Sequence, residues 1–258
     1  MSSEISFLII VPTLNSSRIL SRLVKSLKEQ TYKKWRLVIV DGLSTKYHQD
    51  WLKNCVSSDN RILLEKESEE SRGIYPAMNL GTQFAIRSDW VIFLGSDDWF
   101  NSNFALEIIL KKILNEKYSD NSSIAIFNSQ LLEKKSNKIL RFNKIPTLET
   151  ITKKKLFSYF LLGYMPAHQS ACFSYNAIKK LTPYSDRYKL AADCDLFFKI
   201  LSMDNIDIFF IDEILINIQS GGISSSLIFR RLIEVVLIYK RNFKFYFFIP
   251  IGLRYFRK

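Results

Sequence analysis

Short apolar runs alternate with amphipathic stretches through the first half of this chain, and that alternation limits the fold more than any other feature. Four runs have the length and composition of buried strands, at 5–11, 35–40, 61–64 and 90–94. Amphipathic helices are expected after them, at 17–29, 48–56, 75–86 and 103–114. Such alternation produces right-handed crossovers and a mainly parallel sheet. The sequence therefore predicts an α/β fold, a mainly parallel sheet flanked by helices.

The second half is less regular. Segments 124–128 and 139–142 are expected to form a hairpin across the polar stretch EKKSNK. The remaining expected elements are helices at 148–162 and 193–202 and strands at 170–174 and 206–211. Two glycines at 221–222 and three serines at 224–226 combine turn and helix-capping chemistry. They predict a main domain over 1–222 and a basic, aromatic-rich helical tail over 223–258.

The cysteine spacing and the lengths of the apolar stretches indicate the cellular compartment that the sequence favours. Cys55, Cys172 and Cys194 lie far apart with no CxxC pair, which argues against a disulfide scaffold or a zinc site and fits a reducing cytoplasm. The N-terminus lacks the basic region of a signal peptide. No uncharged apolar stretch reaches about 18 residues, so we expect no membrane-spanning helix.

The positive charge is concentrated in the tail. Of a net charge of +12, residues 227–258 contribute +7, because eight Lys and Arg stand there against one acid, Glu234. These cations alternate with Phe, Tyr, Ile and Leu, a pattern typical of interfacial helices that bind anionic membranes. The alternative is a terminal helix that packs on the main domain with its Lys and Arg solvated.

Polar side chains follow three of the expected strands. Thr13 and Asn15 follow the first strand, Asp41 the second, and Asp97 with Asp98 the fourth. Ligands of open parallel sheets bind beyond the carboxyl ends of the strands. The adjacent acids repel each other, so the pair needs a cation or a helix N-terminus beside it. Oxygen ligands suit Mg²⁺ or Mn²⁺, whereas the alternative is that one acid caps the following helix.

Six segments in order now resemble a known family. IIVPTLN, VIVDGLS, RGIYPAMNLG and FLGSDD, followed by MPAHQSACF and KLAADCDLFFKI, resemble family 2 glycosyltransferases of the GT-A (Rossmann-like) fold over residues 5–222. The likeness is greatest to the branch that builds bacterial surface polysaccharides, where RGIYDAMN is the usual form. Pro76 replaces that Asp here, so a carboxylate near the nucleotide-sugar is lost.

The resemblance implies an inverting, metal-dependent transferase (EC 2.4). It would move a sugar from a nucleotide-diphosphate donor, first of all a UDP-sugar, to a lipid-linked oligosaccharide in O-antigen, capsule or exopolysaccharide synthesis. The implied location is cytoplasmic, peripheral on the inner face of the cell membrane, where the tail would bind anionic lipid. The implied cofactor is Mn²⁺ or Mg²⁺.

The resemblance also implies residue roles. Asp98 would bind the metal, Asp193 would be the catalytic base, and His168 would contact the diphosphate or the acceptor. The nucleotide-sugar would be bound by Thr13, Asn15, Asp41, Arg72 and Asp97.

Each role has a plainer alternative. Asp41 could be a turn residue before Gly42, and Arg72 a solvated surface charge. Asp193 could be a helix N-cap, and a lone His168 is more often structural. Asp195 is a rival base, but its two-residue offset turns it to another face of the helix. His48, in the polar run TKYHQD, is expected at the surface.

Two other functions compete. A nucleotidyltransferase also uses metal-bound diphosphates, but it requires a glycine-rich loop after the first strand, and IIVPTLNSSR has no glycine. A non-enzymatic basic protein that binds nucleic acid or membrane would place its charge across a folded face with stacking aromatics. Since most of the charge lies in the tail, we expect no nucleic-acid partner.

Overall fold

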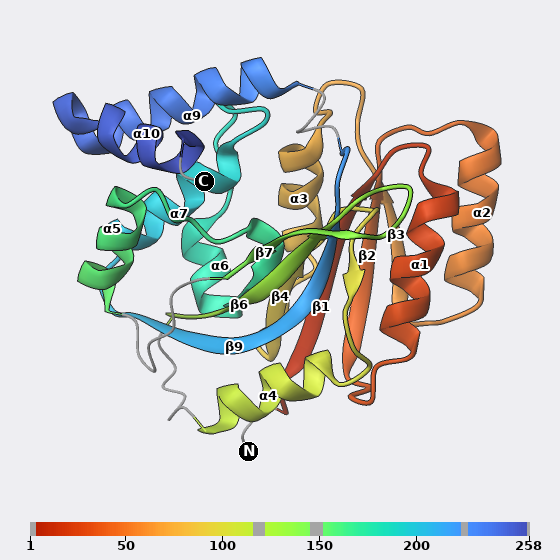
Figure 1. Ribbon diagram of the computed structural model, residues 1–258. Coiled ribbons are helices and arrows are strands. Elements are labelled where there is room, and N and C mark those ends of the chain that lie inside the picture. The colour runs from red at the N-terminus through yellow and green to blue at the C-terminus, as the bar shows by residue number, and fades with distance from the viewer. Residues whose placement is uncertain (1–3, 116–121, 145–151, 223–226, 257–258) are drawn as a thin grey trace.

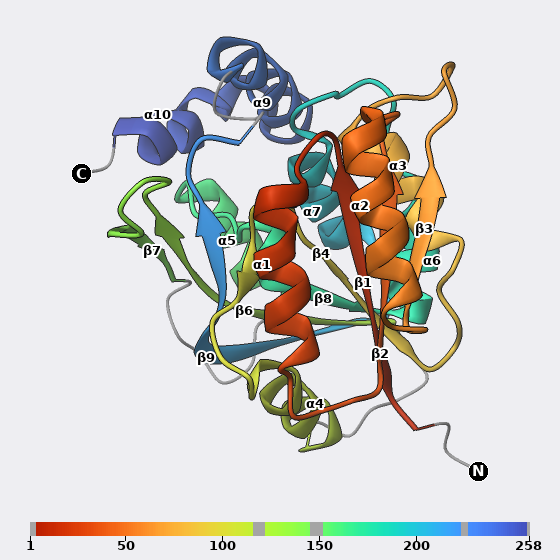
Figure 2. The same ribbon diagram turned by 90° about the vertical axis from the view of Figure 1, so that its right-hand side faces the viewer.

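The computed structural model describes residues 4–115, 122–144, 152–222 and 227–256. Within them, helices cover both faces of one sheet of nine strands (Figures 1 and 2), whose path runs β3-β2-β1-β4-β8-β6-β9-β5 with β7 beside β6. The strands are β1 (Ser6–Thr13), β2 (Trp35–Asp41), β3 (Ile62–Lys66), β4 (Asp89–Phe93), β5 (Trp99–Phe100), β6 (Ser122–Leu132), β7 (Ile139–Asn143), β8 (Ala171–Ser174) and β9 (Ile206–Gln219).

The four strands of the first half are parallel, as predicted. Strand β1 lies between β2 and β4, and its residues Phe7–Val11 are fully buried because helices cover both of its sides. Thr13 at the end of β1 pairs with Asp41 at the end of β2. The register therefore places two predicted site residues next to each other.

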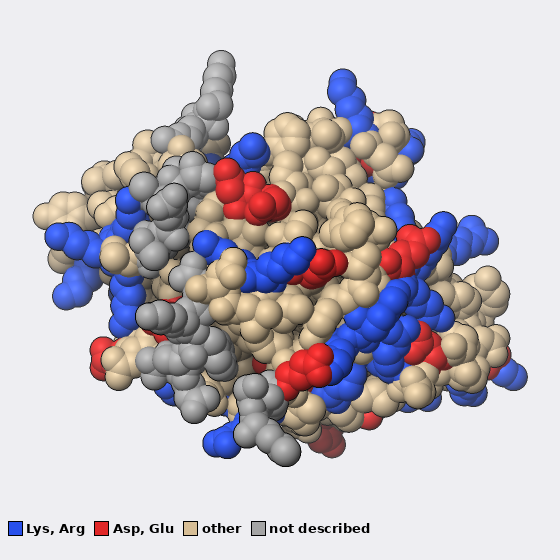
Figure 3. Space-filling model, turned by 90° about the horizontal axis from the view of Figure 1, so that it is seen from below, with Lys and Arg blue, Asp and Glu red and all other residues tan. Residues whose placement is uncertain are grey.

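Two apolar clusters hold the helices to the sheet. One joins the sheet to α1 (Ser17–Lys28), α2 (Lys46–Ser57) and α4 (Ala105–Asn115). The other joins the opposite face to α3 (Ile74–Thr82), α5 (Lys153–Leu161), α6 (Tyr175–Leu181) and α7 (Ala192–Ser202). On the face seen in Figure 3, Lys and Arg side chains gather right of the centre with Asp and Glu side chains at the edges of that area.

The second half contains antiparallel pairs and longer strands than expected. The predicted hairpin is confirmed as the antiparallel pair of β6 and β7. Strand β9 was expected at 206–211 but continues to Gln219, and near its end it pairs with the two-residue strand β5. Because β5 begins at Trp99, this pairing fixes the turn that carries Asp97 and Asp98. Strand β5, helix α6 and the 3-10 turn η1 (His168–Ser170) were not anticipated.

Boundaries elsewhere agree with the sequence to within a few residues. Helix α3 is shorter than the expected 75–86, and of the expected helix 148–162 the part before 152 lies outside the described residues. The serines at 224–226 of the expected domain boundary lie outside them too.

The tail forms α9 (Ile228–Phe243), a 3-10 turn η2 (Lys244–Tyr246) and α10 (Phe248–Phe256). Helices α9 and α10 lie over α7 and α5 (Figure 1). Val235, Ile238, Tyr239 and Phe243 of α9 belong to the core cluster that contains α7. Among the described residues, none of the helices has the length and apolar content needed to cross a bilayer.

Candidate active site

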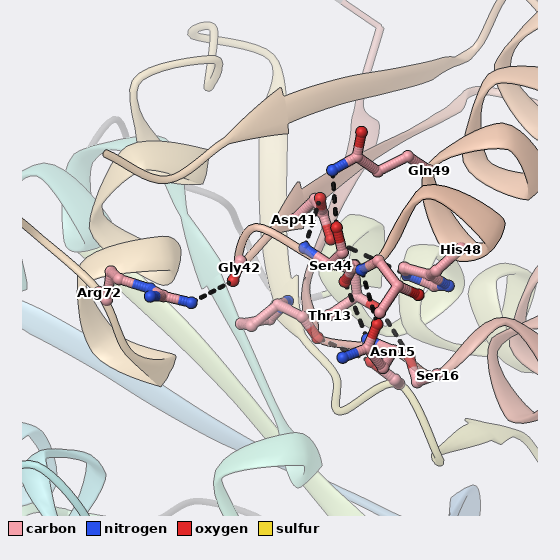
Figure 4. A network of polar contacts seen from close by, with 12 residues as sticks. Thr13, Asn15, Ser16, Asp41, Gly42, Ser44, His48, Gln49 and Arg72 are labelled. Atoms are coloured by element: carbon pink, nitrogen blue, oxygen red, sulfur yellow. Dashed lines mark hydrogen bonds and ion pairs between the residues drawn. The ribbon is translucent and has the colours of Figure 1, made fainter. Parts of the chain in front are cut away.

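Three residues predicted to bind the nucleotide-sugar lie where β1 and β2 end (Figure 4), namely Thr13, Asn15 and Asp41. Asp41 is fully buried, and its Oδ2 accepts a hydrogen bond from the Ser44 N–H at 3.2 Å, so the predicted turn contact exists. Its Oδ1 has no hydrogen-bond partner and lies 3.9 Å from His48 Nε2. A buried carboxylate oxygen without a donor is costly. Within the described residues this buried oxygen therefore has no hydrogen-bond donor of its own.

His48 was expected at the surface, and that prediction is wrong. Only 1% of it is exposed, because α2 turns this residue toward the sheet, where it stacks on Trp51 with ring centroids 6.2 Å apart. Its Nε2 lies 3.2 Å from Thr13 Oγ1, which is also 2.5 Å from Ser16 Oγ. Burial lowers the pKa of His48, against the opposing effect of Asp41. The His48 ring, neutral near pH 7, therefore contacts the Thr13 hydroxyl and lies beside the Asp41 carboxylate.

Asn15 joins the two loops. Its backbone is left-handed (φ 51°), its N–H donates to Ser44 Oγ at 2.8 Å, and its Oδ1 accepts from the Thr45 N–H at 2.9 Å. Both side-chain and backbone contacts hold the loop after β1 to the loop after β2. A cavity of about 240 Å³, lined in part by Asn15, Thr45 and His48, opens beside them.

Arg72 and Glu67 come from the segment between β3 and α3. Arg72 Nη2 donates to the Gly42 carbonyl at 2.9 Å, which holds the half-exposed guanidinium against the loop that follows Asp41. Glu67 was not predicted; its Oε1 accepts from the Gly73 N–H at 2.8 Å, where φ is 137°. Burial raises the pKa of Glu67. The polar run EKESEESR gives no sign that this one acid turns inward.

Asp98 is buried, with 1% exposed, in the turn between β4 and β5. Its Oδ2 accepts from the Gly95 N–H at 2.7 Å, and the Gln169 side chain and the Gln219 backbone also donate to the carboxylate. Burial first, and then the charge of Asp97, raise the pKa of Asp98 to about 8. Neither acid caps the following helix, which begins at Ala105.

Asp97 is more accessible than Asp98 and lies beside cations. Burial raises the pKa of Asp97, and Lys134 and Arg22 oppose that rise. The Arg22 guanidinium lies 3.4 Å from the centroid of the Trp99 ring, and its Nη2 is 3.4 Å from the Asp97 carbonyl. No sequence pattern singles out Arg22, because it lies on the polar side of an ordinary amphipathic helix.

The acid pair fits a divalent cation in its donor chemistry. Burial raises the pKa of both neighbouring carboxyls, and a cation beside them would favour their ionised forms. Mg²⁺ and Mn²⁺ prefer oxygen ligands. No group of three or more His, Cys, Asp or Glu side chains suited to a metal occurs in the described part of the chain. Among the described residues the acid pair would therefore supply at most two side-chain ligands, which leaves ligand positions for substrate oxygens and water.

Asp193 lies in the first turn of α7, on the other side of the site. The helix N-cap is Ala191 with no side-chain cap bond, so the alternative that Asp193 is the N-cap is wrong. Tyr75 instead donates its hydroxyl to Asp193 Oδ1 at 2.9 Å. Asp195 is buried and forms an ion pair with Arg241 of α9, which agrees with its predicted place on another face.

The turn η1 links the acid pair to Asp193. Gln169 donates to Asp98, while its neighbour His168 lies close enough to Asp193 to feel its charge. His168 is 5% exposed, stacks on Phe93 with centroids 5.0 Å apart, and has Nε2 2.6 Å from the Tyr184 hydroxyl. Burial lowers the pKa of His168 to about 4, so the ring is neutral near pH 7. Its contacts in this structure are those of a buried, structural histidine.

Comparison with known proteins decides the family. The family model "Glycosyl transferase family 2" matches residues 8–180. The chain belongs to this family. The predicted family, the predicted GT-A-like fold and the predicted enzyme class, a glycosyltransferase, are confirmed.

One relative and two solved structures that resemble this protein match most of its length. A "PGL/p-HBAD biosynthesis glycosyltransferase" of Mycobacterium tuberculosis is 24% identical over 231 residues, covering 88% of this chain and 82% of its own. The crystal structure of S. aureus TarS 1-349 superimposes with TM-score 0.68 at 18% identity, covering 93% of this chain and 66% of that one. The mannosyltransferase PcManGT from Pyrobaculum calidifontis, solved with GDP-Man and Mn²⁺, gives TM-score 0.65 at 14% identity, covering 98% and 70%.

Proposed function

We propose that this protein transfers a sugar, with inversion, from a nucleotide-diphosphate donor to a lipid-linked acceptor. The observation that carries the proposal is the position of η1. Its Gln169 donates to Asp98, and its His168 bonds Tyr184, whose ring centroid lies 5.2 Å from that of Tyr75, the residue that donates to Asp193. A cation-binding acid pair and a general base then flank one site at the carboxyl edge of the sheet.

The donor's nucleotide is assigned to the end of β1 and β2. Asp41 would accept an N–H from the base, with Thr13 and Arg72 beside it and Asn15 holding the loops together. A UDP-sugar is our first choice, because S. aureus TarS was solved with UDP and with UDP-GlcNAc. PcManGT was solved with GDP-Man, so GDP-sugars form the second group to test.

Asp97 and Asp98 would hold Mn²⁺ or Mg²⁺. The metal, when bound, supplies positive charge to the leaving diphosphate. A bound cation would also favour the ionised form of Asp98, whose carboxyl otherwise keeps its proton up to a pH of about 8.

Asp193 would act as the base. It would take the proton of the acceptor hydroxyl while that oxygen forms its bond to the anomeric carbon, and the bond from that carbon to the diphosphate oxygen breaks with its electron pair leaving on the diphosphate. The Tyr75 hydroxyl would orient the carboxylate for this step. His168, neutral and bonded to Tyr184, would shape the wall between the acceptor and the acid pair.

The tail would hold the enzyme at the cytoplasmic face of the membrane. On α9 the side chains of Phe229, Ile233 and Leu237 are 81%, 62% and 52% exposed and recur every four residues, so they share one face. Lys240 and Lys244 are exposed nearby. An apolar face beside cations suits an anionic bilayer, where a lipid-linked acceptor would also lie.

The test is a transfer assay with UDP-, GDP- and dTDP-sugars and a short-chain lipid-linked saccharide, with and without Mn²⁺. We expect one donor class to give product only with the metal, with the anomeric configuration inverted. Asp193→Asn should lower kcat by about 10²–10⁴-fold and leave donor affinity unchanged. Asp195→Asn, the rival in the same helical turn, should lower kcat far less than Asp193→Asn does. Full transfer by Asp193→Asn would refute its role as base.

A further inference from the structure

Glu234, the one acid in the tail, reaches into the main domain. Only 8% of it is exposed, and its carboxylate accepts hydrogen bonds from three consecutive backbone N–H groups. The donors are Lys189 at 3.1 Å, Leu190 at 2.8 Å and Ala191 at 2.9 Å. Hydrogen bonds from N–H groups to a buried carboxylate are among the stronger ones in proteins.

These three amides immediately precede the first turn of α7. Ala191 is the N-cap of that helix, and no side chain of the segment itself caps it. Free N–H groups and the positive end of the dipole at a helix start need an acceptor, preferably a negative one. Glu234, from another helix, accepts from the N-cap amide of Ala191 and from the two amides before it. Its carboxylate therefore lies at the positive end of α7, and Ala191 is two residues before Asp193 in the chain.

Helix α9 holds α7 at a second point. Arg241, seven residues after Glu234 and on the same face of α9, forms an ion pair with the buried Asp195. In the chain, Asp193 therefore lies between Ala191 and Asp195, and both of these residues are bonded to α9. The exposed Phe229, Ile233 and Leu237 lie on the side of α9 away from the buried Val235, Ile238 and Tyr239.

We propose that Glu234 is a positioning residue for Asp193. This inference rests on the proposed function, in which Asp193 is the base. In this role the tail helix is part of the active site as well as a membrane-binding element. Its inner face sets the backbone that carries the base, so transfer depends on Glu234 even when the acceptor is soluble and no membrane is present.

The test compares full-length variants with a water-soluble acceptor analogue in the absence of lipid. Glu234→Ala should lower kcat by about 10²-fold with the KM for the donor unchanged, because misplacing a catalytic group by about 1 Å costs that much. Glu234→Gln keeps one carbonyl oxygen as an acceptor and should recover part of that loss. Val235→Ala is the matched control, since it loses buried apolar contacts on the same face of α9 and touches none of the three amides.

A kcat for Glu234→Ala within twofold of that of Val235→Ala would overturn the inference. If Glu234→Ala does not fold, Glu234→Gln carries the test, and a wild-type kcat for it would overturn the inference as well. Failure of the proposed function gives a different result, since the wild-type protein itself would then transfer no sugar. A drop in kcat for both Glu234 variants, with Val235→Ala still active, supports the role of Glu234 in positioning Asp193.

Discussion

Replacing Asp98 by Asn should change how stability depends on pH. In the folded chain the pKa of Asp98 is raised to about 8, whereas an unfolded Asp titrates near its ordinary value of about 3.9. A folded pKa above the unfolded one means that the folded state holds the extra proton between those values. The stabilisation that protonated Asp98 gives the folded state is therefore fully present below pH about 4, and it is lost as pH rises through about 8.

The magnitude follows from the pH interval. Over each pH unit in which the folded chain holds one more proton than the unfolded chain, the free energy of unfolding falls by about 1.4 kcal/mol. Between pH 5 and pH 8 the wild-type protein should therefore lose about 3–4 kcal/mol that Asp98→Asn does not lose. The Asn carbonyl oxygen can still accept from the Gly95 N–H, so the turn keeps that contact.

The assay is urea unfolding of both proteins from pH 5 to pH 8 with a chelator present. Asp50→Asn is the control, because Asp50 is exposed on α2 and its curve should run parallel to wild type. In a second series without chelator, added Mn²⁺ should restore stability to the wild-type protein at pH 8 and leave Asp98→Asn unchanged. If the wild-type and Asp98→Asn curves run parallel from pH 5 to pH 8, Asp98 is ionised throughout and the reasoning fails.

Three further predictions follow from individual contacts. Tyr75→Phe removes the hydroxyl that donates to Asp193 and should lower kcat by about tenfold with donor binding by calorimetry unchanged; unchanged turnover would remove Tyr75 from the site. Exchanging Phe229, Ile233 and Leu237 together for Ser should abolish sedimentation with anionic vesicles while transfer to a soluble acceptor continues, and retained sedimentation would exclude this face. Gly81→Ala would place a Cβ 2.4 Å from Ile10 Cγ2 and should destabilise the fold by about 1–3 kcal/mol in a urea titration; an unchanged midpoint would contradict the packing of α3 on β1.

The first half of the fold was readable from sequence because its strands are buried on both sides. Continuous apolar runs such as Phe7–Val11 occur where helices cover both faces of a parallel sheet. The polar residues that end those strands then meet at one edge, so Thr13, Asp41 and Asp98 could be grouped in advance. Strand β5 could not be predicted, since two residues carry no period and form a strand only against β9.

The residues that support the site were missed for a different reason. His48, Glu67 and Glu234 stand in polar or basic stretches where an inward-facing side chain has no local signature. The partners of Glu234 lie 43–45 residues away in sequence and are backbone amides, which every residue has. Such contacts are set by tertiary packing alone.

The two predictions for the tail are compatible in the structure. The alternative of a terminal helix packed on the main domain describes the inner face of α9, where Val235, Ile238 and Tyr239 are buried. The membrane prediction concerns the opposite face, whose large apolar side chains are exposed. Alternation of cations with aromatics cannot distinguish these uses, because a single helix can serve both.

The most direct test of the account is calorimetric binding of UDP, GDP, dTDP and CMP, with and without Mn²⁺, to the wild-type protein and to Asp98→Ala. The account predicts that one nucleoside diphosphate binds the wild-type protein tightly only with Mn²⁺, and that Asp98→Ala loses this metal-dependent gain. If no nucleotide binds to the folded wild-type protein under either condition, or if binding is the same without metal and in Asp98→Ala, the proposed donor site is contradicted.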